Sequence, residues 1–240
     1  MILCLDCGNT RLKWGLRSGS DWAAMGTLRT DDAGALRSCL PAASSIERAI
    51  GCIVASPAAC AAIEAVLPLT VDWIKARDTQ CGVTNRYDDP AQLGADRWAA
   101  LIGARGLHDG ACIVVSAGTA TTIDLLDAAG VFQGGLIMPG LALMHTALAS
   151  NTARLPHAPG HYRPLPRNTH DAITSGAIYG TLGAIERMFS SIAQEPGALC
   201  LLSGGSAESL SNEIALPHLR IDNLALEGLA HIATGMGPTR

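Results

Sequence analysis

The chain opens with MILCLDCGNTRLKWGL, in which an apolar run leads into a carboxylate, a glycine turn and a lysine. If Asn9 and Thr10 form a two-residue turn, Asp6 and Lys13 face each other across two antiparallel strands. One interpretation is a cross-strand ion pair, which contributes about 0.2–1 kcal/mol. The other is a site for phosphate and a metal ion.

The second interpretation gives each polar residue a role. The backbone N–H groups of Gly8, Asn9 and Thr10 would point at an anion, as successive amides do in other anion-binding turns. Lys13 would neutralise phosphate charge, and Asp6 would hold Mg²⁺ directly or through water. From the hairpin alone, the structural and the functional interpretations stay open.

A second glycine turn lies in the middle of the chain, in ACIVVSAGTATTIDLL. Apolar residues flank both turns, and further strands and then helices follow each of them. The matched positions are Asp6 with Ser116, Gly8 with Gly118, and Asn9 with Thr119. Matched turns in a matched order of elements predict two structurally similar halves, residues 1–110 and 111–240. The second turn could also supply the other side of the phosphate site.

A third polar group interrupts an apolar stretch in YDDPAQLGADRW. Gly94 in a helical pattern costs about 1 kcal/mol relative to Ala, so we expect another group to approach the backbone there. Asp96 and Arg97 follow, and on an exposed helix face they would form a simple ion pair. In an apolar setting the carboxylate could instead take a proton from a hydroxyl group. The guanidinium could then bind a substrate carboxylate through its paired donors.

A further glycine turn, SGGS at residues 203–206, lies between a predicted strand and a predicted helix. Two interpretations of this turn are equally good. It could allow the close approach of a flat ligand such as adenine, or it could be a plain tight turn. The sequence lacks the P-loop pattern GxxxxGK[ST] and a GxGxxG after a strand. It also lacks the GxSxG of the α/β-hydrolases.

The elements that hold these residues follow from the apolar patterns, which predict an α/β protein. Asp89 and Pro90 are typical of an N-cap and a first helical residue. We predict strands at 2–6, 11–17, 22–29, 50–56 and 69–74, two strands in 111–126, and a third before Pro139. We predict helices near 31–40, from 58, over 90–107, up to 150, over 168–193 and at the end of the chain, with a loop at 84–90.

Composition narrows the class of protein. The chain has 240 residues, 48% of them hydrophobic, and 17 Lys and Arg against 21 Asp and Glu. No basic run is present, so nucleic acid is not an expected partner. No signal peptide and no membrane span is expected. The eight cysteines are scattered, and Cys4 and Cys7 lie within a strand, so we favour core packing over a redox or metal site. These features predict a soluble cytoplasmic protein.

Five blocks of the sequence, in order, resemble the type III pantothenate kinase family, which includes the proteins named Bvg accessory factors. The blocks are Asp6-x-Gly8-Asn9-Thr10-x-x-Lys13, Gly94-Ala95-Asp96-Arg97, Gly118-Thr119-Ala120-x-Thr122, GGLIMPG (134–140) and NTHDAITSG (168–176). Each block alone has low specificity, but five in sequence, from residue 6 to about 180, are specific.

The resemblance implies a fold, an assembly and cofactors. The family belongs to the superfamily of acetate kinase, the sugar kinases, Hsp70 and actin. Its members have two RNase H-like halves with mixed sheets flanked by helices. They are homodimers whose substrate site lies at or near the subunit interface. They use ATP with Mg²⁺ and depend on a monovalent cation such as K⁺ or NH₄⁺.

The resemblance also implies residue roles. Asp96 would be the general base for the 4′-hydroxyl group of pantothenate. The residues that would bind the phosphates of ATP are Asp6, Gly8, Asn9, Thr10 and Lys13, with Gly118 and Thr119 on the opposite side. The residues that would position pantothenate are Tyr87, Gly94, Ala95, Arg97 and Thr169.

The implied activity is the ATP-dependent phosphorylation of pantothenate to 4′-phosphopantothenate, the first step of coenzyme A biosynthesis. One alternative is a kinase of the same superfamily that acts on another small hydroxylated substrate. The Gly94-Ala95-Asp96-Arg97 block favours the pantothenate family over it. The other alternative is a non-catalytic accessory protein on the same fold. The presence of Asp6, Lys13 and Asp96 together argues against a scaffold without catalysis.

Ser116 departs from the family, which usually has Asp at this position to help bind the monovalent cation. A neutral hydroxyl can coordinate K⁺ but brings no charge. We therefore predict a weaker or altered K⁺ dependence, measured as turnover in K⁺ buffer relative to Na⁺ buffer. A K⁺ response as steep as that of relatives with Asp would contradict this prediction.

Overall fold

The computed structural model describes residues 1–40, 46–151, 158 and 160–235. The chain divides into two compact units. The first contains Met1–Asp109, Gly130–Phe132 and the segment that begins at Asn223, and the second contains Gly110–Ala129 and Gln133–Asp222.

The first unit is built on a five-stranded sheet of order β3-β2-β1-β4-β5. Its strands are β1 (Ile2–Cys7), β2 (Arg11–Ser18), β3 (Asp21–Arg29), β4 (Arg48–Ile53) and β5 (Val71–Trp73). β2 is antiparallel to β1 and β3, whereas β4 is parallel to both β1 and β5. The register of β1 and β2 places Asp6 opposite Lys13, so the prediction that these residues face each other is confirmed.

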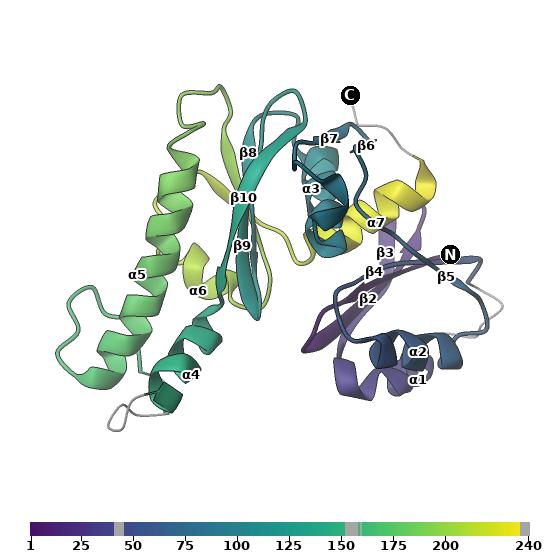
Figure 1. The fold of residues 1–240 in the computed structure, drawn as a ribbon, viewed down its shortest axis with the longest axis horizontal. Coiled ribbons are helices and arrows are strands. Elements are labelled where there is room, and N and C mark those ends of the chain that lie inside the picture. Colours follow the sequence, from purple (N-terminus) through teal and green to yellow (C-terminus); the bar gives the residue numbers. More distant parts are fainter. Residues whose placement is uncertain (41–45, 152–157, 159, 236–240) are drawn as a thin grey trace. The chain divides into compact units, whose positions relative to one another are not determined.

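The alternation of β1 assigns its side chains to two different cores. Leu3, Leu5 and Cys7 face a core that includes residues of α1 (Leu36–Cys39) and α2 (Pro57–Val66). Cys4 lies in another core with residues of α3 (Ala95–Leu107) and α7 (Leu224–Thr234). Asp6, two residues after Cys4, therefore points to the α3 and α7 side. Figure 1 shows α7 on the face of the sheet opposite α1 and α2.

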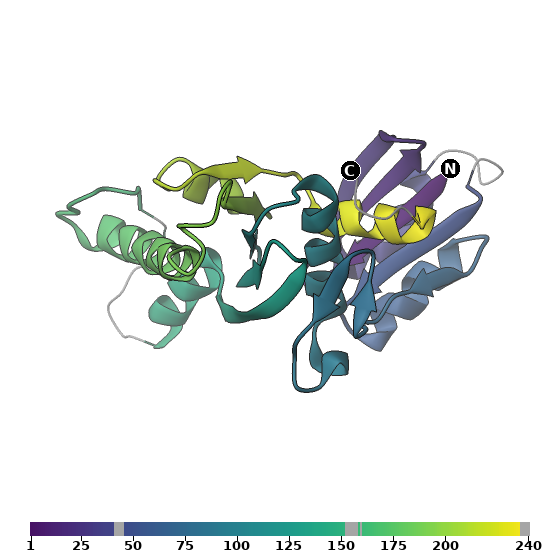
Figure 2. The ribbon, with the colours of Figure 1, turned by 90° about the horizontal axis from the view of Figure 1, so that it is seen from above.

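α3 and α7 pack against each other without intervening side chains, and they lie side by side in Figures 1 and 2. A Cβ at Gly228 would collide with the backbone carbonyl of Ala99, and one at Gly103 would collide with the carbonyl of Leu224. Because the obstacle is backbone in both cases, only glycine allows this crossing.

The segment before α3 differs from the predicted loop at 84–90 and the predicted continuous helix from residue 90. It contains β6 (Thr79–Gln80), β7 (Val83–Asn85) and a short 3₁₀ helix, Pro90–Gln92. Cys81 and Gly82 form the turn between β6 and β7 with positive φ of 47° and 78°, and such a short hairpin gives no readable alternation. Asp89 does cap the 3₁₀ helix by accepting from the amide of Ala91.

Gly94 therefore lies outside the helix, because it is the N-cap of α3. The backbone of Gly94 has φ −55° and ψ 136°, which is not helical. We predicted that Gly94 lies inside a helix, but it marks a helix boundary. The 3₁₀ helix Pro90–Gln92 lies before it and α3 begins after it.

The second unit repeats the strand arrangement of the first. Its strands are β8 (Cys112–Ala117), β9 (Ala120–Leu126), β10 (Val131–Pro139), β11 (Leu199–Ser203) and β12 (His218–Arg220). Their order is β12-β11-β8-β9-β10, and β8 is antiparallel to β9 and parallel to β11. This is the β5-β4-β1-β2-β3 order of the first sheet, so the predicted pair of structurally similar folds is confirmed.

Helices cover the second sheet as in other α/β folds. They are α4 (Leu141–Asn151), α5 (Thr169–Phe189) and α6 (Ala207–Ser211). α5 and α6 bury Ile185 and Leu210 against Ile113 and Val115 of β8, and α5 runs beside the β8–β10 strands in Figure 1. No helix in the described parts of the chain is long and apolar enough to cross a membrane.

The compact units differ from the predicted halves at two segments. Gly130–Phe132 belongs to the first unit because Val131 and Phe132 pair with β7. The segment from Asn223, which we placed in the second half, also belongs to the first unit because α7 packs on α3 and β1. A sequence offset between repeats cannot reveal that the chain returns to its first unit at the end.

The α3–α7 crossing gives a stability prediction. Gly228→Ala should lower the free energy of unfolding by about 1–3 kcal/mol, since overpacking against a rigid backbone costs about that much. The control is Gly180→Ala in α5, where no atom lies within 4 Å of an added Cβ. That exposed helix position should gain up to about 1 kcal/mol. Urea unfolding followed by circular dichroism measures the free energy of unfolding of both variants. Equal values for the two variants would contradict the close backbone contact between α3 and α7.

Candidate active site

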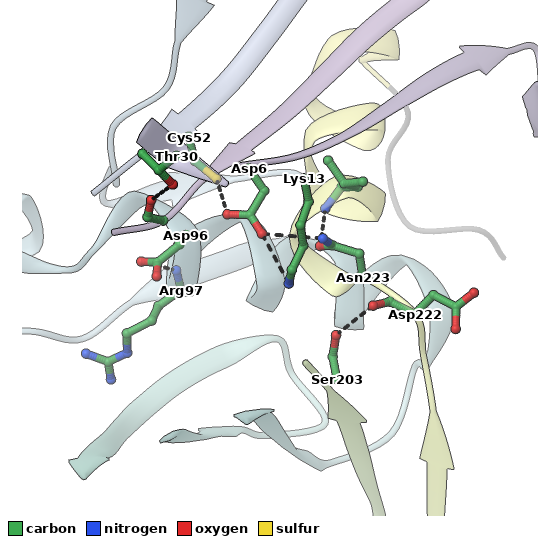
Figure 3. A network of polar contacts seen from close by, with 11 residues as sticks. Asp6, Lys13, Thr30, Cys52, Asp96, Arg97, Ser203, Asp222 and Asn223 are labelled. Atoms are coloured by element: carbon green, nitrogen blue, oxygen red, sulfur yellow. Dashed lines mark hydrogen bonds and ion pairs between the residues drawn. The ribbon is translucent and has the colours of Figure 1, made fainter. Parts of the chain in front are cut away.

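The carboxylate of Asp6 is the centre of a polar network in the first unit (Figure 3). Its Oδ2 lies 3.6 Å from the Lys13 ammonium and accepts a hydrogen bond of 3.3 Å from Asn223 Nδ2. Its Oδ1 accepts from the Cys52 thiol at 3.5 Å. These partners come from β2, the N-cap of α7 and β4, so three segments hold one carboxylate at the end of β1.

The turn that follows Asp6 is held by its own backbone and by Thr30. The Gly8 amide donates to the carbonyl of Arg11 at 3.0 Å. The hydroxyl of Thr30 donates to the carbonyl of Gly8 at 2.7 Å, and its amide donates to the carbonyl of Thr10 at 3.1 Å. The Gly8 amide is therefore engaged within the hairpin, which corrects our expectation that it points at an anion. Asn9 and Thr10 are exposed at the tip.

Asp96 lies in the first turn of α3, where its Oδ1 accepts from the Arg97 amide at 2.8 Å. A Cβ at Gly94 would come within 2.6 Å of that same Oδ1. The group that we expected to approach Gly94 is therefore the Asp96 carboxylate itself. Burial raises the pKa of Asp96, and the negative charge of Asp6 raises this pKa further. Such a carboxylate holds a proton more readily than an exposed one.

Arg97 is buried, with 5% of its surface exposed, so the surface ion-pair interpretation of Asp96 and Arg97 is wrong. Its guanidinium donates to the Tyr87 hydroxyl at 2.8 Å and lies 5.5 Å from the Tyr87 ring and 5.8 Å from the Phe132 ring. The side chain points away from the Asp96 carboxylate in Figure 3. Tyr87 and Phe132 thus fix the orientation of the cation.

Cys52 lies between two acidic groups. Burial raises the pKa of its thiol well above the usual range, and the charges of Asp6 and Asp96 act in the same direction. Burial likewise raises the pKa of Cys4 to about 12 and that of Cys7 to about 11. These thiols are neutral at physiological pH. Cys4 and Cys7 are free and buried, in agreement with core packing of this pair.

In the second unit, the predicted turn forms at the tip of the β8–β9 hairpin. The Gly118 amide donates to the carbonyl of Ala120 at 3.0 Å, as the Gly8 amide does to Arg11 in the first unit. The Gly140 amide donates to the carbonyl of Thr119 at 2.9 Å. A Cβ at Gly140 would lie 2.7 Å from that carbonyl oxygen, so Gly140 is needed for this contact.

The SGGS turn packs against the same hairpin. Gly204 has a positive φ of 103°, and a Cβ there would collide with the backbone of Ala117. The Ser206 amide donates to the carbonyl of Ala117 at 3.0 Å. Packing therefore explains the glycine at 204, which agrees with the tight-turn interpretation. Three turns of the second unit, those at Gly118, Gly140 and Gly204, meet at one place.

Ser116 and Thr169 also belong to the second unit. Ser116 is paired with Thr122 across β8 and β9, whereas the matched Asp6 is paired with Lys13. Thr169 is the first residue of α5, after the N-cap Asn168. It lines a largely apolar cavity of about 860 Å³ between α4 and α5, together with Met144 and Ile173.

The structure brings most of the predicted site residues together within one unit. The first unit holds Asp6, Gly8, Asn9, Thr10, Lys13, Tyr87, Gly94, Ala95, Asp96 and Arg97, and the second holds Ser116, Gly118, Thr119 and Thr169. Sequence reasoning missed Thr30, Cys52, Phe132 and Asn223. Of these, only Asn223 carries a signal, because an Asn before an apolar helical run is typical of an N-cap.

The donor set of the first unit fits Mg²⁺ that binds together with a nucleotide. Within the described residues, no group of three or more His, Cys, Asp or Glu side chains could hold a metal ion. Mg²⁺ is commonly held by one or two carboxylates plus substrate phosphates. Asp6 supplies such a carboxylate, with 14% of its side chain exposed.

The raised pKa of Asp96 gives a prediction about stability. Because the folded protein binds the Asp96 proton more tightly than the unfolded chain, stability falls as pH rises from about 4, the ordinary carboxyl value, through the raised pKa. Asp96→Asn removes this loss and should raise the melting temperature at pH 7, by an amount that disappears in acid. Calorimetric melting curves across this pH range measure the effect.

Asp171 provides a control of opposite sign. Hydrogen bonds from the His161 amide and from Asn168 lower the pKa of the Asp171 carboxyl. Asp171→Asn should therefore lose stability at pH 7 rather than gain it. The same sign for both variants would contradict the assignment for Asp96.

Comparisons with known proteins identify the relatives of this chain. The family model of type III pantothenate kinase matches residues 2–191. A type III pantothenate kinase from Aromatoleum aromaticum is 54% identical over 97% of this chain and 98% of its own length. One from Dechloromonas aromatica is 48% identical over 97% of this chain and 99% of its own.

Solved structures share the fold at low sequence identity. A Campylobacter jejuni protein described as a Baf family transcriptional activator has a TM-score of 0.65 at 20% identity, over 97% of this chain and 98% of its own. A 2-dehydro-3-deoxygalactonokinase protein from Sinorhizobium meliloti has a TM-score of 0.61 at 15% identity, over 98% of this chain and 99% of its own. At these identities the likeness shows a shared fold. By its family match and its relatives, the chain belongs to the type III pantothenate kinase family.

Proposed function

We propose that the protein transfers the γ-phosphoryl group of ATP to the 4′-hydroxyl group of pantothenate, the first step of coenzyme A biosynthesis. Family membership and the names of relatives at up to 54% identity support this proposal. The observation that carries it is Asp96, a largely buried carboxylate with a raised pKa whose charge interacts with that of Asp6. Perturbed carboxylates of this kind are typical of general bases.

The chemistry assigned to each group follows from phosphoryl transfer. Its transition state needs positioning and charge neutralisation more than covalent help. Asp96 orients the hydroxyl group and accepts its proton as the new O–P bond forms and the bond to ADP breaks. Lys13 neutralises phosphate charge. Asp6 is the candidate ligand of Mg²⁺, which when bound supplies further positive charge to the phosphates.

Substrate contacts are part of the same proposal. Arg97 and Tyr87 form a fixed pair that suits the carboxylate of pantothenate, since a guanidinium binds carboxylates through paired donors. The remaining candidates for pantothenate are Gly94, Ala95 and Thr169, and those for ATP are Asn9, Thr10, Gly118 and Thr119. The engaged amide of Gly8 limits that residue to a role in shaping the turn.

The assembly and setting of the enzyme are also proposed. We infer a cytoplasmic homodimer with a monovalent cation, K⁺ or NH₄⁺, near Ser116. Large exposed apolar side chains on the second unit support a protein interface, because monomers rarely expose many of them together. They include Leu136, Ile137, Leu143, Leu148 and Leu165. Light scattering on the purified protein tests the dimer.

The activity is tested by ADP release from Mg·ATP with and without pantothenate. We expect pantothenate-dependent turnover, and Asp96→Asn should lower kcat by about 10²–10⁴-fold, as loss of a general base does. The matched control is Asp72→Asn, which changes an exposed carboxylate paired with Arg48 in the same unit. It should leave kcat unchanged.

Other outcomes select the alternatives. Unchanged turnover in Asp96→Asn would remove this residue from the mechanism. Turnover with another small hydroxylated acceptor, but none with pantothenate, would identify a different kinase of the superfamily. Folded protein without turnover on any acceptor would favour an accessory role, the role suggested by the name Bvg accessory factor.

A further inference from the structure

Asn223 makes two hydrogen bonds that serve different purposes. It is the N-cap of α7, where its Oδ1 accepts from the Leu226 amide at 3.0 Å. Its Nδ2 donates to Oδ2 of Asp6 at 3.3 Å. The helix amide needs an acceptor and the carboxylate needs a donor, so only one orientation of the side-chain amide satisfies both. With 6% exposure, this side chain has little freedom to turn away.

Cys52 contacts the other oxygen of the same carboxylate. Its thiol donates to Oδ1 of Asp6 at 3.5 Å, and the residue is fully buried in β4. Each oxygen of Asp6 therefore has a donor from a buried residue, in addition to the Lys13 ammonium.

We propose that Asn223 and Cys52 are positioning residues that hold the Asp6 carboxylate in the orientation required to bind a divalent metal ion with its nucleotide. This inference rests on the proposed function, because it assigns Asp6 to the metal. Neither residue touches a substrate in this proposal, and both act through Asp6.

The physical reason is the freedom of a carboxylate group. Its terminal torsion is broad, so the orientation of the two oxygens depends on their partners. Lys13 alone binds Oδ2 through a flexible stem and would let the group rotate. Donors from the second layer around a metal ligand fix its orientation, and their loss typically weakens metal binding or activity 10–100-fold.

Asn223→Ser separates positioning from helix capping. Ser and Asn cap helices about equally well, so the variant keeps an acceptor for the Leu226 amide, but it removes the amide donor to Asp6 without adding a charge. We expect 10–100-fold weaker binding of a non-hydrolysable ATP analogue in the presence of Mg²⁺. Binding of the analogue with EDTA and the urea unfolding curve should change little. Isothermal titration calorimetry measures both affinities.

Cys52 is tested with a matched pair of buried cysteines. Cys52→Ala removes the donor and should weaken Mg²⁺-dependent binding of the analogue, whereas Cys52→Ser keeps a donor and should restore it. The control is Cys4→Ala, a change of the same size in the same buried cluster at a residue that does not contact Asp6. It should lower stability without changing the Mg²⁺-dependent affinity.

The outcomes distinguish the inference from the proposed function. Equal Mg²⁺-dependent affinity in wild type and Asn223→Ser would overturn positioning and leave only the cap. Absence of metal-dependent binding in the wild type would overturn it as well. Turnover of the wild type with pantothenate is assayed separately. If the wild type shows no such turnover but the variants still differ from it in Mg²⁺-dependent affinity for the analogue, the proposed substrate is wrong and the positioning role stands.

Discussion

The direct backbone contact between α3 and α7 is the constraint on which the site of the first unit depends. Without side chains at Gly103 and Gly228, the two helices share one layer against β1 and β4. That layer brings Asp96 on α3 and Asn223 before α7 to the face of the sheet that carries Asp6. The axes of two helices separated by ordinary side chains lie about 8–10 Å apart. At that spacing Asp96 and Asn223 would not keep their present positions relative to Asp6.

Asp6 and Asp96 are two partly buried carboxylates of the first unit, and the charge of Asp6 disfavours the charged form of Asp96. Asp6 has a cation and two neutral donors, and so its charge is compensated within the unit. Asp96 accepts from backbone amides, among them that of Arg97, and burial and the charge of Asp6 raise its pKa. The two carboxylates therefore have different surroundings, and this difference is the basis of the different roles that we propose for them.

Sequence reasoning could locate the hairpin, the Gly94–Arg97 block and the repeated fold, because each depends on local pattern or on spacing along the chain. It placed Asp6 opposite Lys13 correctly, since a two-residue turn fixes the register. It could not find Cys52, which looks like any other apolar core residue. It also placed the end of the chain in the wrong unit, because the return of α7 to β1 depends on contacts more than 200 residues apart along the chain, such as that between Asp6 and Asn223.

The two halves share a topology and differ in chemistry at one matched position. In the first hairpin the register pairs Asp6 with Lys13, and in the second it pairs Ser116 with Thr122. The same strand order therefore presents a charged pair in one unit and two neutral hydroxyl groups in the other. A charged pair can bind both a metal ion and the phosphates that accompany it, whereas hydroxyl groups offer only weakly binding neutral oxygens. A repeated fold thus leaves the two units free to specialise, because the register is set by the backbone and the chemistry by the residues that occupy it.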